Sequence, residues 1–273
     1  MIVTVEHVTT YHYDRPVRGV VQSHRLTPTR FDGQTVLDWS VEVSEGTAGG
    51  GFRDGAGDWV QSHSAHGPLS EITVSVHGRV QTQDLAGVLR GHRERMPAAA
   101  YLRDTAPTRA DVALTELARA AVAGATEDLD RAHRLCAAVA EAIAYRPGVT
   151  EAHTTAAEAL RLGEGVCQDH AHALIATARV LDLPARYVSG YLGGEDADAQ
   201  GAAAEAAHAW AEIWVAGLGW IGFDPANACC PDARYVRLGS GLDAAGAAPI
   251  RGVARGGATE RMDVTVSVRA TQQ

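Results

Sequence analysis

The sequence lacks the features that mark several classes of protein. No stretch approaches the roughly 18 consecutive apolar residues that a membrane-spanning helix needs. The amino terminus reads Met1-Ile-Val-Thr-Val-Glu-His-Val and has no basic segment followed by an apolar one, so it does not resemble a secretory signal. A formal net charge of −9 disfavours binding to the phosphates of nucleic acids. We therefore expect a cytoplasmic protein that binds neither membranes nor nucleic acids.

Cysteine is also scarce, and the chain has four: Cys136, Cys167, Cys229 and Cys230. Their spacing contains no paired C-x-x-C pattern, so we expect no zinc site, and the four thiols fit a compartment that keeps them reduced. We interpret the adjacent Cys229-Cys230 pair as structural or incidental, with redox sensitivity as a lesser alternative. Nothing in the sequence calls for a metal or an organic cofactor.

What the sequence does contain is an ordinary globular composition, with 46% hydrophobic and 21% charged residues. A chain of 273 residues fits one large domain or two modest ones, and the change of pattern along it favours two. We assign residues 1–83 to an antiparallel β domain and residues 84–110, where arginines lie among alanine and proline, to a connector. Residues 111–273 form the second domain, which ends in a strand.

Alternating apolar residues predict the strands of the β domain. The first strand opens at Ile2 and ends at Tyr11-His12-Tyr13, and Asp14-Arg15-Pro16 supplies a turn. We interpret Gly49-Gly50-Gly51 as a loop or hairpin without a function, since neither a helix nor a lysine follows to make a phosphate site. Further strands are predicted at residues 37–43 and 72–80.

After residue 110 the apolar spacing becomes helical. One helix begins near Asp111 and ends at Gly124, and another covers about residues 129–143. Thr155-Ala-Ala-Glu158 is a capping box that begins a short helix ending at Gly163. A longer helix is predicted at 167–181, an acidic, alanine-rich loop at 195–206, and strands at 188–192, 208–215, 220–224 and 262–268.

One cysteine stands where a nucleophile is expected. In Gly163-Glu-Gly-Val-Cys167 the glycines interrupt the preceding structure, and the apolar helix begins just after the cysteine. At the N-terminus of a helix, unpaired N–H groups and the positive end of the backbone dipole favour thiolate over thiol. The same N–H groups can receive the oxyanion that forms when a thiolate attacks a carbonyl.

Two later residues can complete such a site. A thiolate nucleophile needs a base that later protonates the leaving amine, and His208 lies in a strand with small alanine neighbours. Asp224 ends the next strand, so antiparallel pairing would place its carboxylate beside His208, where it can orient the imidazole. Each residue alone has an ordinary structural interpretation: a buried thiol, a strand histidine and a turn residue. We infer a catalytic triad because all three occur together in this order.

Four segments resemble the core of bacterial transglutaminase-like proteins and follow that family's order. They are Gly165-Val-Cys-Gln-Asp-His-Ala-His172, Leu183-Pro-Ala-Arg-Tyr-Val-Ser-Gly-Tyr191, His208-Ala-Trp-Ala-Glu212 and Gly219-Trp-Ile-Gly-Phe-Asp224. Upstream, Tyr13-Asp-Arg-Pro-Val17 and Ser23-His-Arg-Leu-Thr-Pro28 resemble the small β domain that precedes the core in many members. The resemblance therefore covers most of the chain.

The resemblance implies an α+β fold. An N-terminal antiparallel β domain is followed by a papain-like transglutaminase core, in which the catalytic cysteine begins a helix packed on an antiparallel sheet. It also implies Cys167 as nucleophile, His208 as base and Asp224 as orienting acid, acting on a peptide or protein substrate. This chemistry requires no metal or organic cofactor. One departure is Ser240-Gly-Leu-Asp243, where many relatives carry Gly-Arg-Asp-Tyr and this chain lacks the arginine and the aromatic residue.

Some alternatives stay open at this point. The triad fits hydrolysis of an amide or peptide bond, transfer to an amine, or an inactive domain that binds peptides. We favour hydrolysis because it needs no second substrate site. Trp210, Trp220 and Tyr191 are either core residues or part of the substrate cleft. Neither His170 nor His172 is expected to replace His208, and for His170 packing or hydrogen bonding is the expected role.

Overall fold

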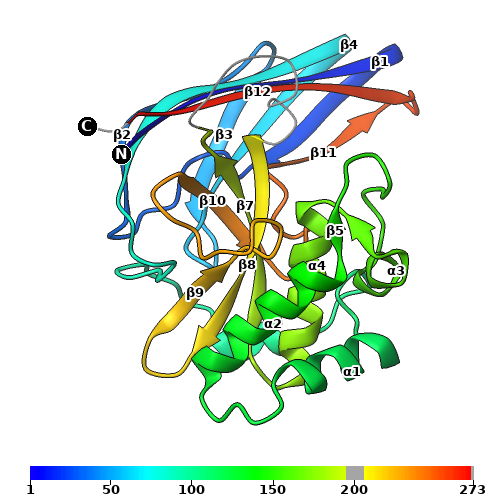
Figure 1. Ribbon diagram of the computed structural model, residues 1–273. Coiled ribbons are helices and arrows are strands. Elements are labelled where there is room, and N and C mark those ends of the chain that lie inside the picture. Colours follow the sequence, from blue (N-terminus) through cyan, green and yellow to red (C-terminus); the bar gives the residue numbers. More distant parts are fainter. Residues whose placement is uncertain (195–205, 272–273) are drawn as a thin grey trace.

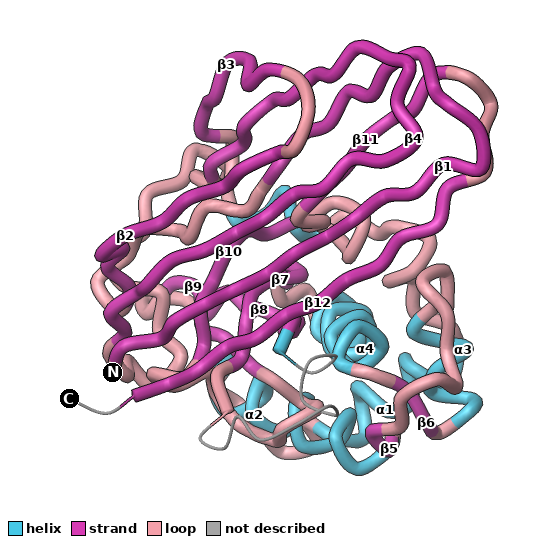
Figure 2. Tube along the Cα trace, turned by 90° about the horizontal axis from the view of Figure 1, so that it is seen from above, coloured by secondary structure: helices cyan, strands magenta, loops and turns pink. Residues whose placement is uncertain are grey.

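The computed structural model describes residues 1–194 and 206–271, which contain two larger antiparallel sheets. The first, called the long sheet below, crosses over one end of the second, the core sheet, and helices pack beside the core sheet (Figures 1 and 2). The long sheet has strand order β11-β1-β4-β2, with β12 also paired to β1 and β3 to β4. Its strands are β1 (Ile2–His24), β2 (Gln34–Val43), β3 (Thr47–Arg53), β4 (Trp59–Thr82), β11 (Ile250–Arg255) and β12 (Glu260–Thr271).

β1 and β4 pair with each other along most of their length. We predicted that the first strand would end before a turn at Asp14-Arg15-Pro16, and this prediction is wrong because β1 continues to His24. The pairing with β4 shifts register between His12 and Val17, so Pro16 lies at an irregularity, where a residue without an N–H is tolerated. The break that proline suggested is an irregularity in the pairing of one continuous strand.

The run Gly49-Gly50-Gly51 lies inside β3, where we predicted a loop or hairpin. β3 pairs with β4 from Thr47 to Arg53, with a register shift between Ala48 and Gly51. A Cβ atom on Gly51 would lie 2.3 Å from the ring of Trp59, so glycine lets the strand pass close to this ring. Gly51 therefore serves close packing rather than a turn.

The carboxyl-terminal strands complete the long sheet. We assigned the last strand to the domain at 111–273, and the structure corrects this assignment because β12 pairs with the first half of β1. Val266 and Val268 of β12 are buried in one apolar cluster with Val3 of β1, so burial of apolar surface explains the placement. β11, which we did not predict, pairs with the second half of β1. The other domain boundaries stay predictions.

The core sheet has strand order β10-β7-β8-β9. Its strands are β7 (Ala185–Leu192), β8 (Ala207–Val215), β9 (Gly219–Phe223) and β10 (Tyr235–Gly241). The helices are α1 (Val112–Ala121), α2 (Asp128–Ala142), α3 (Ala156–Leu162), α4 (Cys167–Val180) and a short 3-10 helix at Ala98–Leu102. β5 (Ala144–Tyr145) and β6 (Glu164–Gly165) form a two-stranded parallel ribbon. Except for residue 206, the loop predicted at 195–206 lies outside the described residues.

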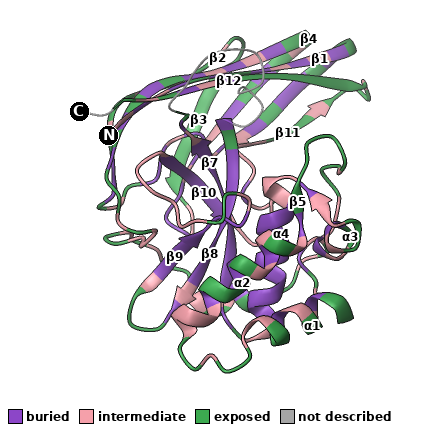
Figure 3. Ribbon diagram, viewed as in Figure 1, coloured by how far each residue is buried: buried purple, intermediate pink, exposed green. Residues whose placement is uncertain are grey.

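α4 is the central helix of the core. Most of its side chains are buried, and it packs against β8 at the face that carries Ala211 and Ile213 (Figure 3). Alanines on both elements let the helix approach the sheet closely, and α1, α2 and α3 pack around it. None of the helices in the described part of the chain is long and apolar enough to cross a lipid bilayer.

Local sequence signals begin and end the helices near the predicted positions. The side chain of Asp111 accepts a hydrogen bond from the N–H of Leu114 at the start of α1. Thr155 and Glu158 form the capping box of α3. Gly163 ends α3 with a φ of 72°, a conformation that glycine adopts without steric cost.

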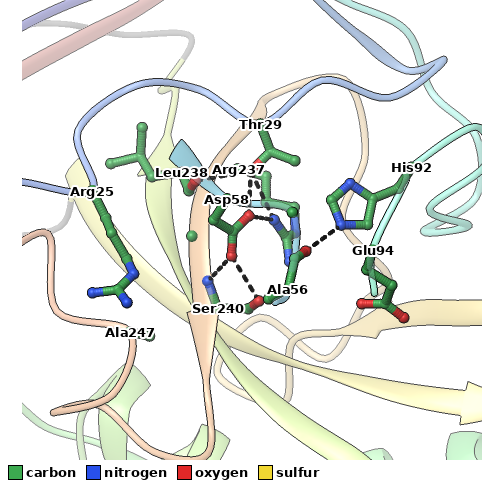
Figure 4. A network of polar contacts seen from close by, with 12 residues as sticks. Arg25, Thr29, Ala56, Asp58, His92, Glu94, Arg237, Leu238, Ser240 and Ala247 are labelled. Carbon is green, nitrogen blue, oxygen red and sulfur yellow. Dashed lines mark hydrogen bonds and ion pairs between the residues drawn. The ribbon is translucent and has the colours of Figure 1, made fainter. Parts of the chain in front are cut away.

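A buried network of charged side chains joins the two sheets. We call it the joint network; its members are Asp58, Glu94, Arg186, Glu212 and Arg237. Arg237 of β10 lies 2.7 Å from Asp58, which precedes β4 (Figure 4). Arg237 also lies 2.8 Å from Glu212 of β8. Glu212 also pairs with Arg186 of β7, whose guanidinium reaches Glu94. The charged groups are therefore buried next to groups of opposite charge, and their attraction offsets the cost of removing them from water.

Candidate active site

Cys167 is the first residue of α4, as the sequence predicted. The preceding residue, Val166, is extended, and its N–H donates to the carboxylate of Asp169 at 2.8 Å. The same carboxylate oxygen accepts a hydrogen bond from the hydroxyl of Thr150, so Asp169 ties a preceding loop to the first turn of the helix. The N–H groups of a first turn have no acceptor inside their helix, and Cys167 carries one of them.

His208 and Asp224 meet at one end of the core sheet. His208 is the second residue of β8, and Asp224 follows directly after β9, which pairs antiparallel with β8. Nε2 of His208 lies 2.7 Å from Oδ2 of Asp224, and both side chains are buried. The strand order therefore brings the two residues together as the sequence analysis expected.

The charges around His208 favour its protonated form. Burial by itself would lower the pKa of the imidazole, but hydrogen bonds to Asp224 and Cys167 and the negative charges of both raise this pKa to about 9. Burial would likewise raise the pKa of Asp224, but the hydrogen bonds from His208 and two further donors hold it below its ordinary value. The imidazole is therefore an imidazolium at neutral pH, placed between a carboxylate and a cysteine.

Asp224 has partners besides the histidine. Its Oδ2 also accepts hydrogen bonds from the hydroxyl of Tyr235 and the side-chain amide of Asn227, each at 2.7 Å, and its Oδ1 accepts from the N–H of Ala226. The sequence analysis missed both side chains. Asn227 lies in the turn after Pro225, and its amide so close to a candidate catalytic acid was a usable signal. Tyr235 begins β10, a strand that the apolar pattern did not predict, so nothing in the sequence pointed to it.

An open pocket of about 170 Å³ lies beside the histidine. Tyr145, Leu192, Ala226 and Asn227 line it together with His208. Tyr145 ends β5 and Leu192 ends β7, so the pocket lies where the helical part of the core meets the sheet. It gives a small group a route to an imidazole that is otherwise buried.

Two of the aromatic residues considered for the substrate cleft are buried elsewhere. Tyr191 is 1% exposed, and its hydroxyl lies 2.8 Å from Nδ1 of His7, where the long sheet meets the core sheet. Trp220 donates its indole N–H to Glu94, and its ring lies 4.0 Å from the guanidinium of Arg186 in the joint network. Both residues therefore belong to the junction of the sheets, and neither lines the pocket beside the histidine.

Trp210, the third aromatic residue considered for the cleft, lies against the site from within the core. It is 2% exposed, and its ring centroid lies 5.4 Å from that of Tyr235 and 6.4 Å from that of His208. It does not line the pocket beside the histidine. All three aromatic residues are therefore buried outside that pocket, and their place in a substrate cleft stays a prediction.

The two histidines of α4 have structural partners. Both ring nitrogens of His170 hydrogen bond to backbone carbonyls, those of Val166 and Ile143. Nε2 of His172 accepts a hydrogen bond from the N–H of Ala244, and burial lowers the pKa of this imidazole to about 4. The expected role of His170 in packing or hydrogen bonding is confirmed.

The remaining cysteines lie apart from the pocket beside the histidine. Cys136, Cys229 and Cys230 line a separate pocket of about 370 Å³, and all four cysteines of the chain are free. Burial raises the pKa of the Cys136 thiol to about 12 and raises those of Cys229 and Cys230. Within residues 1–194 and 206–271, no group of three or more His, Cys, Asp or Glu side chains is arranged to hold a metal ion.

Comparison with known proteins places this geometry in a family. Residues 115–225 match the transglutaminase-like superfamily, and residues 3–81 match the bacterial transglutaminase-like N-terminal region. An uncharacterised protein of Mycobacterium leprae is 30% identical over 273 residues, which cover 97% of each chain. The chain belongs to the transglutaminase-like superfamily. The family and the α+β fold class expected from the sequence are thereby confirmed.

Two further likenesses are more limited. A candidate cysteine protease from Cytophaga hutchinsonii, solved as a crystal structure, shares the fold with a TM-score of 0.74 and 22% identity, covering 100% of this transglutaminase-like chain and 92% of that one. A protein-glutamine gamma-glutamyltransferase of Pseudomonas aeruginosa is 36% identical over 84 residues, which are 30% of this chain and 12% of that protein. The first shows the shared fold, and the second a shared segment.

Proposed function

We propose that the protein is an enzyme that breaks amide bonds of peptides or proteins through a triad of Cys167, His208 and Asp224. The observation that carries the proposal is the imidazole of His208, which is hydrogen bonded to buried Asp224 at 2.7 Å and in contact with a cysteine at the N-terminus of α4. Membership of the transglutaminase-like superfamily supports it. A nucleophile, a base and an orienting acid are the three parts that this chemistry requires.

In the proposed reaction the thiolate of Cys167 attacks the carbonyl carbon of the amide, and the imidazolium of His208 gives its proton to the departing amine. The acyl group is then held as a thioester on the cysteine sulfur. His208 next takes a proton from water as the water oxygen attacks the thioester, which releases the carboxylic acid and restores the thiolate. Asp224 stays ionised throughout and fixes the orientation of the imidazole.

In this reaction the first turn of α4 stabilises the negative charge that forms on the attacked carbonyl oxygen. The backbone N–H groups of Cys167 and Gln168 lie in the first turn, where the helix offers them no acceptor. Such donors, aimed at an oxyanion, typically contribute about 10²- to 10³-fold to the rate. The side chain of Gln168 donates to the carbonyl of Ala152, so it is engaged with the preceding loop.

Water is the acceptor that we favour. The pocket beside the histidine is small, and hydrolysis needs no second substrate site. Transfer to an amine is the second candidate, because part of the core resembles a protein-glutamine gamma-glutamyltransferase. The chain contains 24 lysines and arginines in total, and every one is an arginine. It therefore has no lysine side chain that could accept an acyl group from itself.

The test is intact mass spectrometry after incubation with a panel of glutamine-containing peptides, with and without an added primary amine. We expect a thioester adduct or a cleaved or deamidated peptide with wild-type protein and neither with Cys167→Ala. Incorporation of the amine would select transfer over hydrolysis, and the absence of lysine keeps self-modification from obscuring it. Equal turnover by wild type and Cys167→Ala would refute the triad. No turnover and no adduct on any peptide would favour an inactive binding domain.

A further inference from the structure

We propose that Tyr235 is a positioning residue of the triad, which sets how tightly Asp224 holds His208 by sharing the charge of the carboxylate. This inference rests on the proposed function. Tyr235 is the first residue of β10 and is 5% exposed. Its hydroxyl lies 2.7 Å from Oδ2 of Asp224, the same oxygen that faces the imidazole.

Three donors compete for this one oxygen. Nε2 of His208, the amide of Asn227 and the hydroxyl of Tyr235 all lie 2.7 Å from Oδ2 of Asp224. Oδ1, by contrast, accepts from the N–H of Ala226 at 3.0 Å. A hydrogen bond donated to a carboxylate stabilises its negative charge, so every neutral donor at Oδ2 leaves less charge to attract the imidazolium. Tyr235 therefore weakens the hold of Asp224 on the proton of His208 while keeping the carboxylate in place.

The direction of the tyrosine's hydrogen bond is fixed by its partners. An ionised carboxylate can only accept, so the single hydroxyl proton of Tyr235 goes to Asp224. The hydroxyl oxygen is then free to accept from the thiol of Cys229, whose Sγ lies 3.4 Å away. Cys229 is itself held against the acid, because its backbone exchanges hydrogen bonds with that of Asp224 at 2.8 and 3.1 Å. A hydrogen bond from the Cys229 thiol to the hydroxyl oxygen therefore favours the orientation in which Tyr235 donates its proton to Asp224.

The ring of Tyr235 holds its place independently of the hydroxyl. Its centroid lies 5.9 Å from that of His208 and 5.4 Å from that of Trp210, and the ring is buried in a cluster with Trp210 and Val188. Tyr235→Phe should therefore keep the packing and remove one donor from Oδ2. The variant separates the hydrogen bond from the structural role of the ring.

The sharing of charge matters for the step in which the amine leaves. The imidazolium of His208 must give up a proton there, and a proton held too firmly by the carboxylate is transferred slowly. The same carboxylate must still orient the ring. Asn227 and Tyr235 together allow Asp224 to orient the imidazole without over-stabilising its charged form.

The test is a pH titration of the His208 imidazole in the full chain by ¹⁵N NMR, with the signal assigned by its loss in His208→Ala. In wild type we expect the pKa of His208 at about 9. In Tyr235→Phe we expect it higher by about half a unit, with kcat lowered about three- to tenfold. Cys229→Ala should move the pKa of His208 in the same direction by less, and it provides the test if Tyr235→Phe does not fold.

The matched control is Tyr191→Phe, which removes another buried tyrosine hydroxyl, one bonded to His7 rather than to Asp224. It should leave the titration of His208 unchanged. An unchanged or lowered pKa of His208 in Tyr235→Phe would overturn the inference about Tyr235 and leave the triad standing. If wild-type His208 instead titrates near its ordinary value and Cys167 is no more reactive than the other thiols, the proposed function itself fails.

Discussion

Among the described residues three aspartates are completely buried, and two of them invite comparison: one lies in the joint network and one in the candidate active site. Asp58 and Asp224 are each 0% exposed, and each accepts several hydrogen bonds. Asp58 faces the guanidinium of Arg237, whereas Asp224 faces the imidazole of His208. The carboxylates have similar surroundings, and the difference lies in whether the cationic partner can lose its proton near neutral pH.

Residues of the joint network and residues of the candidate active site lie on the same strands but differ in their ability to exchange protons. Glu212 of the joint network lies on β8 with His208, and Arg237 lies on β10 with Tyr235. Arginine stays charged at any accessible pH, so the joint network is a fixed set of charges that locks the two sheets together. His208 can gain and lose a proton, which is what an acid–base group must do. β8 and β10 therefore carry both the fixed charges that hold the two sheets together and residues of the candidate active site.

Removing His208 should give the largest effect on activity. We expect His208→Ala to lower kcat/KM by at least about 10³-fold, because the imidazole both pairs with the thiolate and protonates the leaving amine. The melting temperature should also fall, because buried Asp224 loses its cationic partner, so activity is compared at a temperature at which both proteins are folded. The matched control is His66→Ala, which removes an exposed histidine of β4 and should leave kcat/KM as in wild type. Comparable activity of His208→Ala and His66→Ala would contradict the assignment.

Breaking the joint network should give the largest effect on stability. Asp58→Asn leaves the buried guanidinium of Arg237 with one carboxylate fewer, so we expect the free energy of unfolding to fall by about 3–5 kcal/mol. Asp38→Asn is the control, since it removes a carboxylate from an exposed pair with Arg79 and should cost at most about 1 kcal/mol. Urea denaturation of both variants measures the difference. Equal losses would show that burial of the network contributes little.

One group in each region should lose its contribution to stability at opposite ends of the pH scale. The pKa of His208 is raised to about 9, so the stability that its charged form contributes is complete below pH 6.5 and is lost as pH rises through 9. Burial would raise the pKa of Glu212, but the charges of Arg237 and Arg186 and their hydrogen bonds lower it to about 2. The contribution of ionised Glu212 is therefore complete above pH 4.5 and is lost as pH falls through 2. Denaturation at a series of pH values tests both signs.

Activity adds a sharper readout at the alkaline end. We expect kcat/KM to fall about tenfold per pH unit above pH 9, as His208 loses its proton. In Asp224→Asn the alkaline limb should move down, because the negative charge that raises the pKa of His208 is gone. The activity that Asp224→Asn retains is measured at pH 6 and at pH 9. If the activity of wild type and of Asp224→Asn fell at the same alkaline pH, the fall would not report the ionisation of His208.

The smallest expected effect is a difference in reactivity among the thiols. Iodoacetamide at pH 7 should alkylate Cys167 first, because it contacts the imidazolium of His208. Burial raises the pKa of the Cys136 thiol to about 12 and raises those of Cys229 and Cys230, so these residues should react at least about tenfold more slowly. Peptide mapping after brief labelling measures the order. Labelling of Cys230 before Cys167 would count against a reactive thiolate.

The sequence predicted the catalytic half of the molecule better than the long sheet. Helix starts follow from short-range chemistry, such as the capping box at Thr155 and the glycines before Cys167, so α3 and α4 begin where the pattern indicates. The order of β8 and β9 was enough to bring His208 to Asp224, because neighbouring antiparallel strands need only a short turn.

Long-range pairing explains what the sequence did not reveal. Leu37 continued the alternation of its strand, yet it is 45% exposed because the pairing of β2 with β4 shifts register between Val36 and Asp38. The partners of Asp224 were partly hidden for the same reason, since Tyr235 lies on a strand whose place depends on β7. Such pairings depend on where distant strands meet, which local patterns do not encode.

The pairing of β1 with β11 and β12 has a consequence for biosynthesis. Asp14 and Thr259 hydrogen bond across this part of the long sheet although they are 245 residues apart. A ribosome adding about 5–20 residues per second leaves the free edge of β1 waiting roughly ten to fifty seconds for these partners. During that interval the catalytic segments have already emerged and can collapse, while β1 exposes an unpaired edge that chaperones or other nascent chains can reach. Strands late in this sequence therefore protect one of its earliest strands.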